Sequence, residues 1–187
     1  MKTVELMVEE HDNIQRMLKV IQKVCVGVMK GEPVDDGEFR EIIGFIREYA
    51  DAHHHGKEEK FLFPEMVSRM GPIAENLIRH GMLVEHDLGR AHVMELETAL
   101  DAYQGNPDDE NRLDILTEAM GYAHLLYRHT EKENHVVYTF AEDRLDEAVK
   151  ADLDRRTAAF ERDPANAAVR EKYLSLLDRL EKKYGLA

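Results

Sequence analysis

Apolar residues recur at three- and four-residue intervals along most of this chain, which is the spacing of an amphipathic helix. Over residues 4–29 they fall broadly on one side of a helix: Leu6, Ile14, Met17, Leu18, Ile21 and Val28. Gly31, Pro33 and Gly37 then interrupt the pattern. The sequence therefore predicts a first helix over residues 4–29.

A second helix is predicted over residues 38–69. Its apolar positions near the start are Phe39, Ile42, Ile43, Phe45 and Ile46. Gly71 and Pro72 form a stop signal after it. Pro64 lies inside this segment and lacks a backbone donor, so we expect it to kink or break the helix.

A third helix is predicted over residues 72–103, and Gly105, Asn106 and Pro107 end it. A fourth begins after Asp108 and Asp109 and extends to about residue 142. Four long helices joined by short connections pack as antiparallel neighbours. The expected fold class is all-α, an antiparallel four-helix up-and-down bundle with additional C-terminal helices.

The C-terminal helices are predicted over residues 144–160 and 166–184, with Asp163 and Pro164 between them. We expect them to pack on the outside of the bundle. The predicted division is a bundle of two helical hairpins followed by a C-terminal helical appendage: residues 1–145 (hairpins of about 1–71 and 72–145) and residues 146–187.

Charge and composition narrow the functional classes. The formal net charge of −13 would repel nucleic acid and an anionic membrane surface. The single cysteine, Cys25, excludes an internal disulfide and cysteine-based metal sites, and its apolar helical context suggests a buried side chain. Acidic residues near the N-terminus and the lack of a long apolar run predict a cytoplasmic protein without a membrane span.

The chain repeats itself at an offset of 75 residues. Glu10-His11-Asp12 recurs as Glu85-His86-Asp87, and His54-x-x-x-Glu58 recurs as His129-x-x-x-Glu133. Histidine occupies only 10 of 187 positions, so these matches indicate an internal duplication of a helical hairpin.

The duplicated residues suit a metal centre. A histidine and a glutamate four residues apart share one helical face, so each hairpin can direct one histidine and one His-Glu pair into the bundle. Four imidazoles and two carboxylates are too many for one zinc ion, but they suit two ions about 3.5–4 Å apart. Mixed nitrogen and oxygen ligands favour iron or manganese.

Four motifs resemble the hemerythrin-like HHE cation-binding domain over residues 1–145: EEHDNI, HHHGKEEKFLFPEM, VEHDLGRAH and YRHTEKENHVVY. The resemblance implies two iron ions with an oxo or hydroxo bridge, with manganese as the other candidate. The implied ligands are His11, His54, Glu58, His86, His129 and Glu133, with Glu58 and Glu133 as bridges.

Two positions depart from the oxygen-carrying hemerythrins. Met82 stands where those carriers have a fifth histidine, four residues before His86. Glu133 follows His129 by four residues, whereas the carriers have an aspartate at the fifth position. These departures argue against reversible oxygen carriage.

The implied function is binding of, and reaction with, a small oxidant: oxygen, peroxide or nitric oxide. The alternatives are an iron donor that repairs iron centres, and an oxygen or redox sensor that binds metal without turnover. Whether the protein is an enzyme is open at this stage; an enzyme here would be a di-iron oxidoreductase or peroxidase. The expected partner is a small diatomic molecule or peroxide.

The remaining histidines have no histidine partner at the repeat offset. We expect surface or ligand-supporting positions for His53 and His55, and we reject a His55-Glu59 pair because the duplication selects His54 and Glu58. We expect most of the other four to be exposed: His80, His92, His124 and His135. For His80 and His124 the alternative is a position that orients a ligand.

Several further residues have two readings. The repeated acids either hydrogen-bond the ligand histidines or form exposed faces: Glu10, Glu85, Asp12 and Asp87. Tyr122 lies nearly on the face of His129 and either lines the site or packs in the core.

Overall fold

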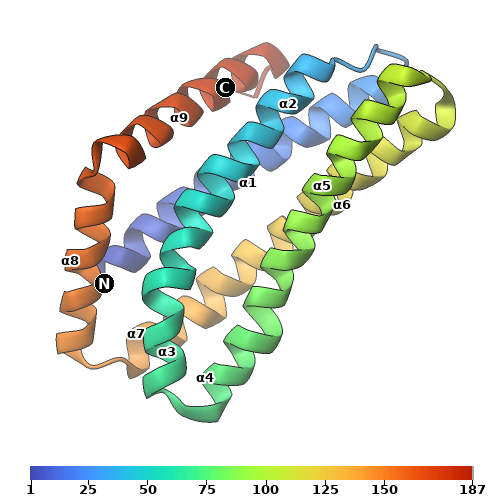
Figure 1. The fold of residues 1–187 in the computed structure, drawn as a ribbon. Coiled ribbons are helices and arrows are strands. Elements are labelled where there is room, and N and C mark those ends of the chain that lie inside the picture. Colours follow the sequence, from blue (N-terminus) through green and yellow to red (C-terminus); the bar gives the residue numbers. More distant parts are fainter. Residues whose placement is uncertain (187) are drawn as a thin grey trace.

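The computed structural model describes residues 1–186, which form helices joined by short loops, with no strand among them (Figure 1). Consecutive α-helical and π-helical elements continue one another end to end, and each such continuous helical stretch is called a rod. The first rod is α1 (Lys2–Met29), and the second runs through α2 (Asp36–Gly44), η1 (Phe45–His55), η2 (Glu58–Leu62) and α3 (Phe63–Arg69). The all-α prediction is confirmed.

The remaining rods follow the predicted boundaries within a few residues. The third contains α4 (Gly71–Leu77), η3 (Ile78–Met82) and α5 (Leu83–Gly105), and the fourth contains α6 (Asp109–Lys132), η4 (Glu133–Val137) and α7 (Tyr138–Arg144). The C-terminal rods are α8 (Glu147–Arg162) and α9 (Pro164–Tyr184). The η segments are π-helices, whose wider turns often mark functional sites.

The helix starts follow from local chemistry. The carboxylates of Asp35, Asp108 and Asp163 accept hydrogen bonds from free backbone N–H groups at the starts of α2, α6 and α9. Gly71 begins α4 with φ of 77°, a conformation that a side chain would disfavour. These capping residues set the boundaries that the sequence predicts.

Pro64 does not end the second rod. The π-helical turn of η2 comes just before it, and the Phe63 N–H bonds to the Glu58 carbonyl. Because Pro64 has no N–H, the Lys60 carbonyl loses its usual helical donor, and Arg156 Nη2 of α8 donates to it instead at 3.0 Å. The expected break is therefore replaced by a change of helix type and a contact with the C-terminal segment.

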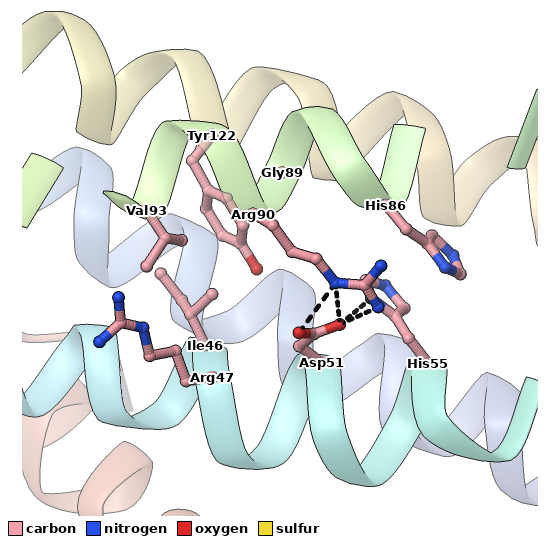
Figure 2. Close-up of a pocket in the computed structure, with 9 residues that line it drawn as sticks. All are labelled: Ile46, Arg47, Asp51, His55, His86, Gly89, Arg90, Val93 and Tyr122. Carbon is pink, nitrogen blue, oxygen red and sulfur yellow. Dashed lines mark hydrogen bonds and ion pairs between the residues drawn. The ribbon is translucent and has the colours of Figure 1, made fainter. Parts of the chain in front are cut away.

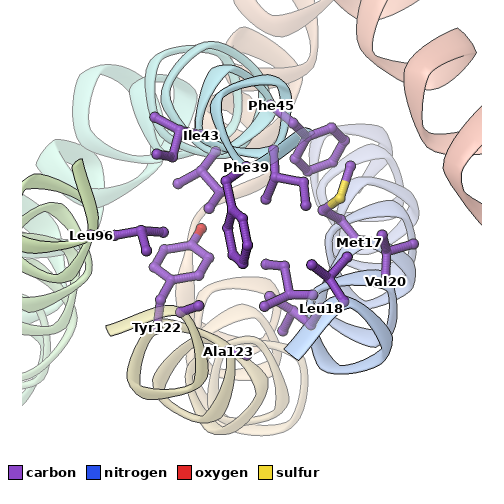
Figure 3. Close-up of a cluster of buried hydrophobic side chains, with 14 of the residues drawn as sticks. Met17, Leu18, Val20, Phe39, Ile43, Phe45, Leu96, Tyr122 and Ala123 are labelled. Atoms are coloured by element: carbon purple, nitrogen blue, oxygen red, sulfur yellow. The ribbon is translucent and has the colours of Figure 1, made fainter. Parts of the chain in front are cut away.

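Two apolar clusters fill the interior. The first lies between α1, α2, η1, α5 and α6 and includes Met17, Phe39 and Leu96 (Figure 3). The second includes Met7, Leu62 and Met82. Along α1, Met7 belongs to the second cluster and Ile14 to the first, so the buried Glu10 and His11 lie between them.

The C-terminal helices contribute to both clusters. Leu153 of α8 lies in the second cluster, and Leu177 of α9 lies in the first; both are fully buried. The pair packs along α1 and the second rod (Figure 1). A domain boundary near residue 145 stays a prediction.

Over residues 1–186, no helix combines the length and the apolar character needed to cross a lipid bilayer.

Candidate metal centre

The six residues predicted as metal ligands meet in the polar layer between the two apolar clusters. Each has at most 1% of its surface exposed. They come from four rods: His11 from α1, His54 and Glu58 from η1 and η2, His86 from α5, and His129 and Glu133 from α6 and η4. Both glutamates are the first residue of a π-helical turn, so the repeat extends to the local backbone.

Four of these residues form a first group, with one ligand atom of each within 4.8 Å of all the others: His11, His54, Glu58 and Glu133. The Nε2 atoms of His11 and His54 are 2.8 Å apart. His11 Nε2 lies 3.2 Å from Glu133 Oε2, and His54 Nε2 lies 3.8 Å from Glu58 Oε2. This group has two nitrogens and two carboxylates directed at one point.

A second group meets the same distance criterion: His55, Glu58, His86 and His129. His86 Nε2 is 3.5 Å from Glu58 Oε2 and 3.9 Å from Glu133 Oε1. His129 Nε2 is 3.1 Å from Glu133 Oε2. Both carboxylates therefore lie between the two pairs of predicted histidine ligands.

The residues fit a metal centre because their inward-facing atoms lack partners. Within residues 1–186, buried atoms without a hydrogen bond include Glu58 Oε2, both carboxylate oxygens of Glu133, and Nε2 of His55, His86 and His129. Buried polar atoms are normally hydrogen-bonded. A cluster of nitrogen and oxygen acceptors around one space is what cations would satisfy.

The outward-facing nitrogens of two predicted ligand histidines contact carboxylates. His54 Nδ1 lies 2.8 Å from Glu10 Oε2, and His129 Nδ1 lies 2.9 Å from Glu85 Oε2. A carboxylate there holds the proton on Nδ1 and leaves the Nε2 lone pair free for a metal. Of the two roles predicted for Glu10 and Glu85, hydrogen bonding to the histidines or forming an exposed helix face, the structure shows the first.

The sequence reasoning missed the lysines beside these carboxylates. Lys57 Nζ donates to Glu10, and Lys132 Nζ donates to Glu85. Lys57 and Lys132 are also related by the 75-residue offset. Extending the repeat comparison beyond the histidines and acids would have found them.

The outward-facing nitrogens of the other two predicted ligands, His86 and His11, contact a second repeat-related pair of residues. Glu59 Oε1 is 2.7 Å from His86 Nδ1, and Asn134 Oδ1 is 2.7 Å from His11 Nδ1. Each of the four histidines therefore has an acceptor on Nδ1. The repeated acids Asp12 and Asp87 are exposed.

The pKa values of the two central carboxyls are shifted in opposite directions. Burial and the nearby Glu133 charge raise the pKa of Glu58 well above its usual range. Burial would also raise the pKa of Glu133, but His129 and His11 outweigh it and lower that pKa well below its usual range. Burial opposes the charged form of His129, yet Glu133 and Glu85 raise its pKa to about 9. These shifts favour the neutral form of Glu58 beside an ion pair of His129 and Glu133.

Tyr138 is a further residue of the centre that the sequence did not reveal. Its hydroxyl donates to Glu58 Oε1 at 2.6 Å, and its ring stacks on His11 with centroids 5.4 Å apart. At the repeat-related position, Phe63 stacks on His86 at 5.9 Å without a hydroxyl. The two halves of the centre therefore differ in hydrogen bonding.

A cavity of about 150 Å³ adjoins the second group. Ile46, Val93 and Tyr122 line it together with His55 and His86, which lie at one end (Figure 2). Tyr122 also belongs to the first apolar cluster, so both readings of this residue apply. The cavity offers a small molecule space beside the predicted ligands.

Of the two positions expected for His53 and His55, surface or ligand-supporting, the surface position is wrong, since both are buried. His53 Nε2 lies 3.3 Å from Glu10 Oε1 and 3.0 Å from Glu161 Oε1. It therefore supports Glu10, the carboxylate that contacts His54 Nδ1. The exposed histidines are His80, His124 and His135. The orienting role considered for His80 and His124 belongs instead to the carboxylates and Asn134.

The match to known families agrees with this geometry. The model of the hemerythrin HHE cation-binding domain matches residues 2–141, most of the chain. The chain has no match among curated proteins and none among solved structures. On the family match, the chain belongs to the hemerythrin HHE cation-binding domain family.

Proposed function

We propose that this protein is a non-haem di-iron protein that binds and reacts with oxygen, peroxide or nitric oxide. His11 and His54 would hold one ion, His86 and His129 the other, and Glu58 and Glu133 would bridge them. The observation that carries the proposal is the convergence of buried Nε2 and carboxylate atoms, with every ligand Nδ1 turned outward to an acceptor. The donor set suits iron with an oxo or hydroxo bridge, or manganese.

Reaction with a small oxidant is supported by the surroundings of the centre. Iron, when bound, supplies redox electrons, and the protein restricts what reaches it. The ligands lie between two apolar clusters, and the adjoining cavity is too small for a large substrate. Tyr138 holds a proton on its hydroxyl 2.6 Å from Glu58 and 3.4 Å from His11 Nε2.

Metal analysis and stopped-flow mixing test this function together. The purified chain, loaded anaerobically with ferrous iron, should contain two iron ions, and mixing with peroxide should change its optical spectrum. An exposed-histidine variant, His124→Ala, is the matched control and should behave as wild type. A spectrum that does not change in the fully loaded protein would contradict the proposed reactivity.

The burial of the ligands disfavours the alternative of an iron donor. All six predicted ligands are almost completely enclosed, so release of iron requires the helices to separate. We expect transfer of iron to a strong chelator to be slow compared with the reaction with peroxide. A sensor without turnover would instead react once and hold the product.

We also propose that the first four rods form the antiparallel up-and-down bundle expected from the sequence. Short connections between successive rods support this arrangement, as do the contacts of α5 with α6 and of α1 with α6. Spin labels on exposed residues near the ends of successive rods would test it, because neighbouring ends should be close.

A further inference from the structure

The C-terminal helix α8 contacts the residues that support one predicted ligand. Glu161 Oε1, near the end of α8, accepts a hydrogen bond from Lys57 Nζ at 2.6 Å and lies 3.0 Å from His53 Nε2. Lys57 and His53 also contact Oε1 of Glu10, whose other oxygen lies 2.8 Å from His54 Nδ1. A chain of three contacts therefore joins Glu161 to the predicted ligand His54.

The repeat-related half of the centre is built differently. Lys132 is the counterpart of Lys57 and donates to Glu85. Among the residues that the structure describes, no second carboxylate forms an ion pair with Lys132, whose side chain is 41% exposed, whereas Lys57 is fully buried. Glu161 is thus an addition to one half only, and it comes from beyond residues 2–141, which the family model matches.

The burial of Lys57 explains why two carboxylates surround it. Its ammonium is shielded from water, and the ring centroid of Phe160 of α8 lies 5.5 Å from Nζ. A buried charge is costly unless opposite charges and hydrogen bonds compensate it. Glu10 and Glu161 share this compensation, so one oxygen of Glu10 remains free to contact His54.

Loss of the Glu161 charge would change this balance. Glu10 would then be the main counter-charge of Lys57, and its negative charge would be drawn towards the ammonium and away from His54. A carboxylate on Nδ1 orients a histidine ligand and increases its basicity. A weaker contact with Glu10 would therefore make His54 a poorer metal ligand.

The position of α8 depends on other contacts as well. Asp154 Oδ1 accepts hydrogen bonds from the Thr3 backbone N–H and the Thr3 hydroxyl, at 2.8 and 2.9 Å. Arg156 Nη2 donates to the Lys60 carbonyl at 3.0 Å. Loss of the Glu161 charge can therefore be compared with loss of a charge that only fastens α8 to α1.

We infer that Glu161 is a positioning residue of the metal centre: through Lys57 it holds the Glu10 carboxylate on His54 Nδ1, and so strengthens binding of the ion that His54 would hold. This inference rests on the proposed two-metal function. It makes the C-terminal helices part of the centre as well as a cover for one face of the bundle.

Binding of Co²⁺ to the full chain tests the inference, because competition with an optical chelator gives a constant for each of two ions. Glu161→Gln keeps the shape of the side chain and removes its charge. We expect it to weaken one constant about fivefold, less than the 10–100-fold of residues that contact a ligand directly. Asp154→Asn removes a charge from the same helix and is the matched control, which should leave both constants unchanged.

A double variant distinguishes positioning from a general loss of stability. If Glu161 acts through Glu10, its substitution should have little further effect once Glu10→Gln has removed that carboxylate. Unchanged constants in Glu161→Gln, an equal loss in Asp154→Asn, or additive losses in Glu10→Gln, Glu161→Gln would overturn the inference. A wild-type protein that binds fewer than two Co²⁺ ions would instead contradict the proposed function on which it rests.

Discussion

Asn134 Oδ1 lies 2.7 Å from His11 Nδ1, whereas the repeat-related His86 has the Glu59 carboxylate at the same distance. A carboxylate partner makes an imidazole a stronger electron donor than an amide does. The ion beside His86 is thus expected to be held more strongly than the ion beside His11. The duplicated hairpins give similar positions for the ligands but different electrostatics.

Adding a charge at one of these two partners and removing it at the other should shift the metal affinity and the reduction potential of the centre in opposite directions. Asn134→Asp should strengthen metal binding at His11 and lower the reduction potential of the iron centre, because added negative charge stabilises the oxidised ions. Glu59→Gln should weaken binding by about 10–100-fold and raise the potential. Competition with a chelator and redox titration measure the two effects. Shifts of the same sign in both variants would contradict the role assigned to these partners.

The two buried glutamates should be required for a full complement of metal. The double variant Glu58→Gln, Glu133→Gln keeps the side-chain volume and removes both negative charges. We expect fewer than two iron ions per chain after gel filtration, as measured by elemental analysis. Replacing the repeated but exposed Asp12 and Asp87 by Asn is the matched control and should leave the content at two. Full occupancy in the glutamate variant would refute the bridging role.

Metal loading should release protons in a manner that depends on pH. Before loading, the raised pKa of Glu58 favours a proton on its carboxyl, and His129, whose pKa is raised to about 9, carries a proton near pH 7. Both must leave before these groups bind cations, so we expect about two protons per chain on loading. Near pH 10 His129 has already lost its proton, and the release should fall by about one.

The same groups determine whether the metal affinity rises or falls with pH. Protons compete with metal at His129 below its raised pKa, so the apparent metal affinity should rise with pH from 7 towards 9. Calorimetry in buffers of different ionisation enthalpy measures the proton count. An affinity that falls over this range would show that the charges at the centre are assigned incorrectly.

The sequence predicts the helices and the six clustered residues because both follow from short-range spacing and from the repeat. Apolar periodicity locates the rods, and the offset of 75 residues relates His11 to His86 and His54 to His129. The supporting Lys57 and Lys132 follow the same offset and could have been found.

Other parts of the centre depend on features that the repeat does not contain. His55 was expected at a surface or ligand-supporting position, because an α-helical wheel turns it aside from His54, but the segment is π-helical, and His55 lies beside Glu58, His86 and His129. Tyr138 and Phe63 differ in type, so their shared position beside the histidines is visible only after folding.

The cavity beside His55 and His86 leads to a prediction about access. Val93 is buried on α5 and points into this space, near Ile46 (Figure 2). Val93→Phe should occupy part of the cavity, reducing the second-order rate with peroxide without changing the metal content. Its overpacking is expected to destabilise the fold by about 1–3 kcal/mol.

The control for this experiment separates access from general destabilisation. Val84 lies on the same helix and is 46% exposed, so Val84→Phe adds the same ring outside the cavity. Rates should be measured by stopped flow well below the melting temperature of each variant, with iron content determined on the same samples. If Val93→Phe retained the wild-type rate at full iron occupancy, the oxidant would have to enter by another path. A reduced rate in Val93→Phe alone would identify this cavity as the path, because the two variants differ in where the ring lies.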